Sequence, residues 1–143
     1  MRRVSVIDFG MSRVLRSLPL GKMCNEWCGK AQYAAPEMWL RDAHYDPRGC
    51  DVWSLGVVLF VMLFGIPPFS QGAIASDEVF AFMRRQPHGM AAVVANWRGA
   101  GVDLPMVSDE ALGLVARMLD PDPMRRLDLK GVLSHPFLCG SSQ

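Results

Sequence analysis

Residues 51–64 read DVWSLGVVLFVMLF, and the apolar run continues to Ile66. These residues are apolar on every face of a helix, and the Gly-Ile-Pro-Pro run at 65–68 predicts where the helix ends. A membrane-spanning helix needs ~20 residues, whereas the run from Leu55 to Ile66 is shorter. We therefore expect a core helix, buried on all sides, at the centre of the fold.

Further helices are expected on the C-terminal side of this stretch. Each has a residue placed to cap its N-terminus and an apolar stripe or a clear stop. The three predicted helices run from a Ser76 cap to Arg85, from a Ser108 cap to Leu119 and from an Asp128 cap to a stop at Pro136.

The N-terminal side is different. Residues 4–7 form a short run rich in β-branched side chains, and Asp8 follows it. This pattern predicts a strand that ends in a turn. Residues 11–32 show no sustained period, so we expect a long loop there, of the kind that compact domains usually keep for function. The fold class is therefore mainly α.

Composition narrows the function classes. The chain has 143 residues, half of them hydrophobic, with a net charge of +1. Such a chain can bury a core, which excludes disorder, and its balanced charge gives no general attraction to nucleic acid or an anionic membrane. Asp8 interrupts the apolar start before it could be a signal peptide.

The four cysteines, Cys24, Cys28, Cys50 and Cys139, are irregularly spaced. This favours reduced thiols in an intracellular protein, cytoplasmic or nuclear, over a disulfide framework. His44 and Cys50 follow Cys24 and Cys28 without the paired spacing of a zinc site.

Two short motifs carry chemical information. Asp8-Phe9-Gly10 puts a carboxylate in a turn, where it can meet a divalent cation, although a plain Asp-x-Gly surface turn is the better explanation of an isolated tripeptide. Ala35-Pro36-Glu37 follows, just after Gly29–Tyr33. Together the two motifs resemble the activation segment of a protein kinase, which opens at DFG and closes at APE.

Three later stretches strengthen the resemblance. Residues 51–56 resemble the opening of the family's central helix F, residues 119–127 resemble the run before its last helix, and residues 135–138 resemble its usual end. The sequence of residues 32–37 is similar to the one that serine/threonine kinases carry at this point. Residues 56–69 are similar to the calcium/calmodulin-dependent and AMP-activated-type group.

The resemblance implies a fold and an activity. Residues 1–139 would form a partial kinase domain, with a short strand, an activation segment at 8–37 and a helical C-terminal lobe at 38–139 whose helices resemble F to I; residues 140–143 would be a tail. An intact relative transfers the γ-phosphoryl group of ATP to a protein Ser or Thr, with Mg²⁺ as cofactor.

The resemblance also implies missing parts. A kinase needs a Gly-rich loop, a strand lysine and a catalytic loop that supplies the general base. None fits before Asp8, so we expect an N-terminal lobe to be missing, no catalytic residue in this chain, no tight binding of ATP or Mg²⁺, and no activity alone. The alternative is a non-catalytic, pseudokinase-like docking module or decoy for a protein substrate or regulatory protein.

Several residues take roles from the family motifs. Asp8 would hold magnesium, and Phe9 would pack as a switch. Glu37 and Arg126 would form an ion pair between the end of the activation segment and the helical base. Asp51 would accept hydrogen bonds from the absent catalytic loop, or simply cap its helix. Gly10, Gly29 and Tyr33 would belong to the activation segment, and Ala35, Pro36, Trp53 and Gly56 to its structural support.

Two positions depart from the family. Lys30 stands where relatives carry a hydroxyl, so it could pair with a catalytic Asp and hinder transfer. Glu26 stands near where many relatives carry a phosphorylated threonine, and either partly replaces that charge or is a solvated loop residue.

The helix from 76 to 85 resembles helix G, which relatives use for docking. Phe80 is the candidate for an exposed partner contact there, whereas Val79, Phe82 and Met83 are expected in the core. Trp27, Trp39 and Trp97 are also expected to pack. Few helices remain to cover residues 55–64, so we expect one apolar face of the central helix to stay wet.

Overall fold

The computed structural model describes residues 4–15, 24, 27–40 and 44–140. Its described part is mainly helical, as the sequence predicts, and the only strand-like pairing in it is an isolated antiparallel bridge between Cys24 and Tyr45. The helices are α1 Pro47–Phe64, α2 Glu78–Arg85, α3 Met90–Gly99, α4 Asp109–Met118, α5 Leu129–Leu133 and α6 Pro136–Cys139, with short 3-10 helices η1 Phe9–Met11, η3 Ala31–Tyr33 and η4 Pro36–Trp39.

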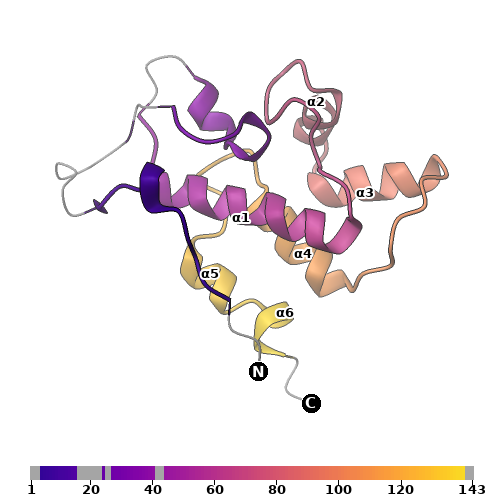
Figure 1. The fold of residues 1–143 in the computed structure, drawn as a ribbon. Helices are drawn as coiled ribbons and strands as arrows, with labels where there is room; N and C mark the ends of the chain where they lie inside the picture. The colour runs from indigo at the N-terminus through magenta and orange to yellow at the C-terminus, as the bar shows by residue number, and fades with distance from the viewer. Residues whose placement is uncertain (1–3, 16–23, 25–26, 41–43, 141–143) are drawn as a thin grey trace.

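Helix α1 runs through the middle of the molecule, with α4 beside it, α2 above it in this view and α3 extending past its C-terminal end (Figure 1). The side chain of Asp46 caps it by accepting from the amide of Arg48 at 3.0 Å, and Pro47 occupies the first turn. The helix therefore begins four residues before Asp51. The expectation that Asp51 caps the helix is wrong, because the Asp-Pro pair upstream provides an earlier start.

Gly56 sets the distance between α1 and α4. A Cβ atom built there would lie 2.9 Å from the Cβ of Met118 and 3.0 Å from Cδ2 of Leu119, which is too close for any side chain. The absence of a side chain lets the two helices pack closely around the buried core. That core includes Trp53, Val57, Phe60, Phe69, Val94, Val115 and Leu119.

Helix α1 is not buried on all sides. Leu55, Val58 and Met62 are 49%, 42% and 76% exposed, respectively, and share one face. The wet apolar face that the sequence predicts is therefore present. By length and composition α1 could also cross a membrane, but one such helix is weak evidence, since core helices pass the same test.

The predicted helix caps are mostly found. Ser108 accepts from the amide of Ala111, and Asp128 from that of Gly131. Ser76 does not cap α2; Asp77 does, because its carboxylate reaches the amide of Phe80 at 3.0 Å. Helix α3 was not predicted, and Pro136 begins α6 as well as ending the preceding turn.

Residues 4–7 form no strand, contrary to the sequence prediction. Val4, Val6 and Ile7 are 96%, 79% and 80% exposed. A β-strand satisfies its N–H and C=O groups through a neighbouring strand, and none lies beside these residues in the described ranges. The β-branched composition is present, but the described part of the chain offers no strand to pair with it.

Candidate functional site

The candidate site is built around Arg126, which is 6% exposed. Its Nη1 donates to Oε1 of Glu37 at 2.6 Å, and its Nη2 donates to Oε2 at 2.8 Å, so the predicted ion pair is present and bidentate. Such a planar fork matches a carboxylate and is among the strong hydrogen-bonded pairs in proteins. It joins η4 to the turn that follows α4.

Other groups complete the environment of Arg126. Nη1 also donates to the carbonyl of Gly49 at 2.9 Å, and Nε donates to the carbonyl of Asp120 at 3.1 Å. The guanidinium lies over the Trp53 ring, 5.0 Å from its centroid. Arg126 therefore ties η4, the first turn of α1 and the 120–126 turn to one another.

Cys50 lies against the same ion pair. Its Sγ donates to Oε1 of Glu37 at 3.5 Å. Burial, followed by the negative charge of Glu37, raises the pKa of the Cys50 thiol well above its usual range. The thiol therefore stays protonated and is not a reactive nucleophile.

The segment before Glu37 is also held against α1. The hydroxyl of Ser54 donates to the carbonyl of Tyr33 at 2.9 Å, and Nε2 of Gln32 donates to the carbonyl of Ser70 at 3.2 Å. At Gly72, whose φ is +115°, a Cβ would lie 2.5 Å from the carbonyl oxygen of Ala31. Residues 31–39 thus form a fixed platform on the N-terminal half of α1.

The outer edge of this platform is exposed. Lys30 precedes η3 in extended conformation and is exposed, and Gly29 has a φ of +91°. Trp27, 46% exposed, meets Trp39 edge to face, with ring centroids 4.4 Å apart. Trp97 packs against Phe60, as expected. Glu26 lies outside the described residues, so its role stays a prediction.

Asp8 lies apart from this cluster. Its φ of 62° is left-handed, it precedes η1 and its side chain makes no capping hydrogen bond. Phe9 beside it is 65% exposed. No hydrogen bond or ion pair joins Asp8 to Glu37 or Arg126 within the described ranges.

The donor set decides whether Asp8 fits a magnesium site. Mg²⁺ prefers a near-octahedral set of oxygens. In the part of the chain that the structure describes, no three His, Cys, Asp or Glu side chains gather where they could hold a metal ion. These residues therefore do not fit a self-sufficient metal site, and Asp8 offers a single carboxylate.

Phe80 is not the exposed contact that the sequence predicts. It is 2% exposed and packs edge to face on Trp53 and Phe69, with centroids 6.3 and 5.8 Å away. The prediction is wrong because two large rings, distant in sequence, select the face of α2 that is buried. Met83 is buried as expected, and Val79 and Phe82 are half-buried.

Sequence reasoning also missed the importance of Asp77. This carboxylate is 1% exposed and accepts from the amides of Ser70, Gln71 and Phe80 and from the Ser70 hydroxyl, at 2.8–3.0 Å. Burial alone would raise the pKa of Asp77, but these hydrogen bonds outweigh it and hold the pKa below its usual value. An Asp-Glu pair before an apolar helix is the signal that could have identified this cap.

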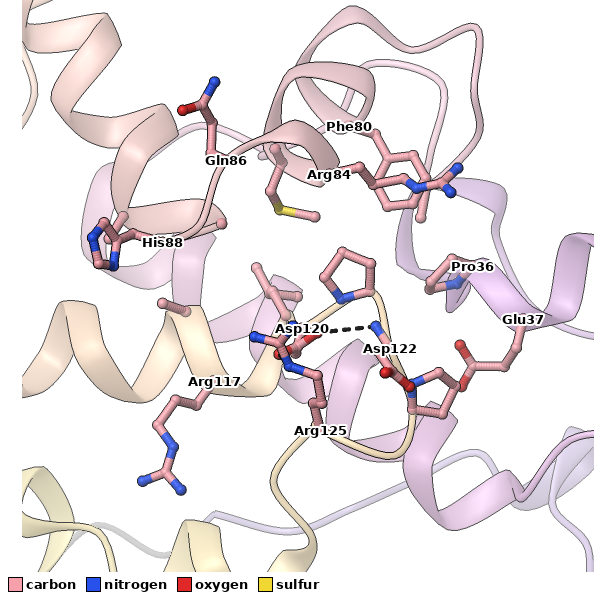
Figure 2. A pocket seen from close by; sticks show the side chains of 18 of the residues that line it. Pro36, Glu37, Phe80, Arg84, Gln86, His88, Arg117, Asp120, Asp122 and Arg125 are labelled. Atoms are coloured by element: carbon pink, nitrogen blue, oxygen red, sulfur yellow. Dashed lines mark hydrogen bonds and ion pairs between the residues drawn. The ribbon is translucent and has the colours of Figure 1, made fainter.

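A groove of about 1080 Å³ opens between η4, α2 and the turn after α4 (Figure 2). Phe80 and Arg84 lie on one side of it, and Asp120, Asp122 and Arg125 on the other. Glu37 and Pro36 stand at one end. Glu37, the partner of Arg126 in the ion pair, is thus one of the residues that line the groove.

Comparison with known proteins adds to this geometry. The sequence matches the protein kinase domain family over residues 1–138. Calcium-dependent protein kinase 8 of rice (Oryza sativa subsp. japonica) is 39% identical over 145 residues, covering 98% of this chain and 23% of that protein. Calcium-dependent protein kinase 21 of rice is 41% identical over 140 residues, covering 94% and 21%.

A relative from another group is similarly close. Ribosomal protein S6 kinase 2 alpha of chicken (Gallus gallus) is 38% identical over 136 residues, covering 94% of this chain and 16% of that protein. The chain therefore spans about a fifth of the length of the curated relatives it matches.

Proposed function

This chain belongs to the protein kinase domain family, and from that premise we propose that it forms the helical lobe of a serine/threonine kinase. In the whole protein the reaction would transfer the γ-phosphoryl group of ATP to a protein Ser or Thr hydroxyl. The observation that carries the proposal is the Glu37–Arg126 ion pair, which fixes the predicted activation-segment end on α1. Residues 31–39 then serve as the platform beside which a protein substrate lies.

Asp8 is assigned to the nucleotide end of this lobe. It would be one magnesium ligand among several, with the others coming from outside the described residues. Its exposed turn leaves the carboxylate open to solvent, and the apolar side chains around it support the same assignment. Val6, Ile7, Phe9 and Met11 are 79%, 80%, 65% and 66% exposed, an unusual cost in water that further polypeptide would remove.

We further propose that the 143-residue chain does not transfer phosphate by itself. Phosphoryl transfer depends on positioning and charge stabilisation by several groups at once. Of the groups that the family resemblance implies, the described residues supply the Asp8 carboxylate alone. The purified chain, incubated with Mg²⁺ and γ-labelled ATP, should label no serine or threonine peptide above background. Labelling that Asp8→Asn abolishes would contradict this.

The lobe assignment is tested in the longest protein that cells make containing these residues. There Asp8→Asn should reduce phosphorylation at least about 100-fold, in the range of losses seen when a transition-state charge is removed. Asp103→Asn is the matched control, since Asp103 is exposed and makes no ion pair in the described ranges. Equal activity in the two variants would refute the role of Asp8.

A second candidate function is a non-catalytic docking module. The exposed apolar face formed by Leu55, Val58 and Met62 favours it, because such a face binds partners or aggregates. A transcript that starts at Met1 and gives a stable protein in cells would support the docking module. An upstream reading frame with a catalytic-loop H-R-D motif would instead favour the enzyme.

A further inference from the structure

Lys30 stands at the outer edge of the platform with a fixed backbone. The backbone is extended there, and the Lys30 carbonyl accepts from the amide of Tyr33 at 3.0 Å. The next residue, Ala31, lies so close to Gly72 that a Cβ atom at Gly72 would be 2.5 Å from the Ala31 carbonyl oxygen. Lys30 itself is exposed. Its ammonium group is therefore presented to solvent from a fixed point on the chain.

The platform holds no carboxylate that could neutralise Lys30. Within residues 27–40 the other charged side chain is Glu37, and both of its carboxylate oxygens accept from Arg126. Lys30 forms no ion pair among the residues that the structure describes. On this platform the Lys30 ammonium is thus the charge left uncompensated.

The segments that pack against the platform leave this charge in place. The loop before α2 carries one charged side chain, Asp77, which is 1% exposed and accepts four hydrogen bonds. Before the first turn of α1, Asp46 is paired with Arg48 at 2.8 Å. Burial, followed by the charge of Asp46, raises the pKa of Asp51, which is the opposite of the shift that a neighbouring ammonium would cause. A substrate that approaches this edge therefore meets the charge of Lys30.

Aromatic side chains flank Lys30 on both sides along the chain. Trp27 and Tyr33 are 46% and 37% exposed, and Trp27 is held edge to face on Trp39, with ring centroids 4.4 Å apart. A peptide segment that lies across these rings would exclude water from the space beside Lys30 and strengthen an ion pair formed there. The edge is therefore suited to an extended segment with an acidic side chain.

We propose that Lys30 is a specificity-determining residue, which selects protein substrates with an Asp or Glu close to the Ser or Thr that is phosphorylated. This inference rests on the proposed function, in which a substrate lies beside residues 31–39. Successive residues of an extended chain are ~3.3 Å apart, so an acid within three positions of the acceptor lies within ~10 Å of it. A basic residue at the same position is repelled by Lys30.

The size of the preference follows from the exposure of the ion pair. An exposed pair changes an equilibrium by up to about fivefold. The contrast between an acidic and a basic peptide counts one attraction and one repulsion. The acidic peptide should therefore be preferred by about 2- to 25-fold.

The test uses the longest protein that cells make containing these residues, with γ-labelled ATP and a set of serine peptides. Each peptide carries either Asp or Lys at one of the three positions on either side of the serine, and neutral residues elsewhere. The readout is the ratio of kcat/KM for the Asp peptide over the Lys peptide at each position. We expect a ratio above about 2 at one position or more, falling towards 1 in about 1 M salt, because salt screens exposed charges. A ratio below about 2 at every position would overturn the proposal.

Two variants of Lys30 and a matched control assign the preference to this side chain. Lys30→Thr should bring the ratio close to 1, and Lys30→Glu should invert it. Lys130→Glu reverses the charge of an exposed lysine on α5, outside the platform, and should leave the ratio within about twofold of its original value. Far-UV circular dichroism verifies that the variants keep their helices. An unchanged ratio in Lys30→Glu would refute the proposal.

The same variants separate selection from the hindering role that the sequence suggests for Lys30. If Lys30 acts by pairing with a catalytic Asp, Lys30→Thr raises kcat for all peptides alike and leaves the ratio unchanged. That result would contradict the proposal. A change in the ratio without a uniform rise in kcat would support it.

Failure of the proposed function is distinguishable from failure of this inference. A protein that labels no peptide would refute the proposed phosphate transfer. The same peptides, carrying a fluorescent label, are then titrated against that protein by fluorescence polarisation. Tighter binding of the Asp peptides that Lys30→Glu reverses would support selection by Lys30, and equal binding of the Asp and Lys peptides would overturn it.

Discussion

Replacing Arg126 with Met should loosen the fold far more than the same change at Arg125. Arg126 is 6% exposed and donates four hydrogen bonds, two to Glu37 and one each to the carbonyls of Gly49 and Asp120. Its removal leaves the Glu37 carboxylate, 11% exposed, without a counter-charge. Removing one partner of such a buried pair costs about 3–5 kcal/mol.

Arg125 gives the matched comparison. Its ion pair with Asp120 is 3.4 Å long, and its side chain is 70% exposed. Exposed pairs contribute ~0–1 kcal/mol, so Arg125→Met should be close to neutral. The two variants differ by one position and carry the same chemical change.

The assay is amide hydrogen exchange read by mass spectrometry over residues 31–40 and 47–54. It reports local opening and does not require two-state unfolding. A loss of 3 kcal/mol corresponds to exchange about 100-fold faster or more, up to the rate of an unprotected amide. Arg126→Met should produce that change and Arg125→Met should not.

The double variant Glu37→Gln with Arg126→Met sharpens the test. If the two side chains act as a pair, the double variant loses less than the sum of the single variants. Equal exchange in Arg125→Met and Arg126→Met, or strictly additive losses, would refute the reasoning.

Three further predictions follow from the packing and charges. Gly56→Leu should destabilise the fold by about 1–3 kcal/mol, because the new side chain overpacks against Met118. The yield of soluble helical protein should fall for this variant and stay unchanged for Gly99→Leu. Because the pKa of Asp77 is lower in the folded chain than its unfolded value of about 3.9, the ionised carboxylate stabilises the fold above that pH. This stabilisation is lost as the pH falls through the lower folded pKa. Asp77→Asn should therefore make amide hydrogen exchange in α2 less dependent on acid pH. Met62→Lys should reduce light scattering without loss of helix, because Met62 is 76% exposed, whereas Val57→Lys should unfold the chain.

Periodicity predicted the elements whose signals are local. The apolar run of α1 and the caps Ser108 and Asp128 depend on residues within one or two turns, so sequence alone located them. The Glu37–Arg126 pair was predicted from motif resemblance, since no local pattern links these two positions.

The missed features depend on distant residues. The apolar residues between Val79 and Met83 are spaced so that either of two overlapping helix faces could be buried. Phe80 is buried because it packs against the rings of Trp53 and Phe69. Helix α3 starts at Met90, and its N-cap residue, Gly89, makes no side-chain hydrogen bond, so the sequence there resembles a loop. Residues 4–7 have strand composition, but composition cannot show whether a pairing strand is available.

The ion pair at the centre of the molecule also has a consequence for synthesis on the ribosome. Glu37 and Arg126 are 89 residues apart in the chain. At translation rates of about 5–20 residues per second, Glu37 is made roughly 4 to 18 seconds before its partner. During that interval Glu37 lacks the Arg126 guanidinium, so the contact that ties η4 to the 120–126 turn is a late step of co-translational folding.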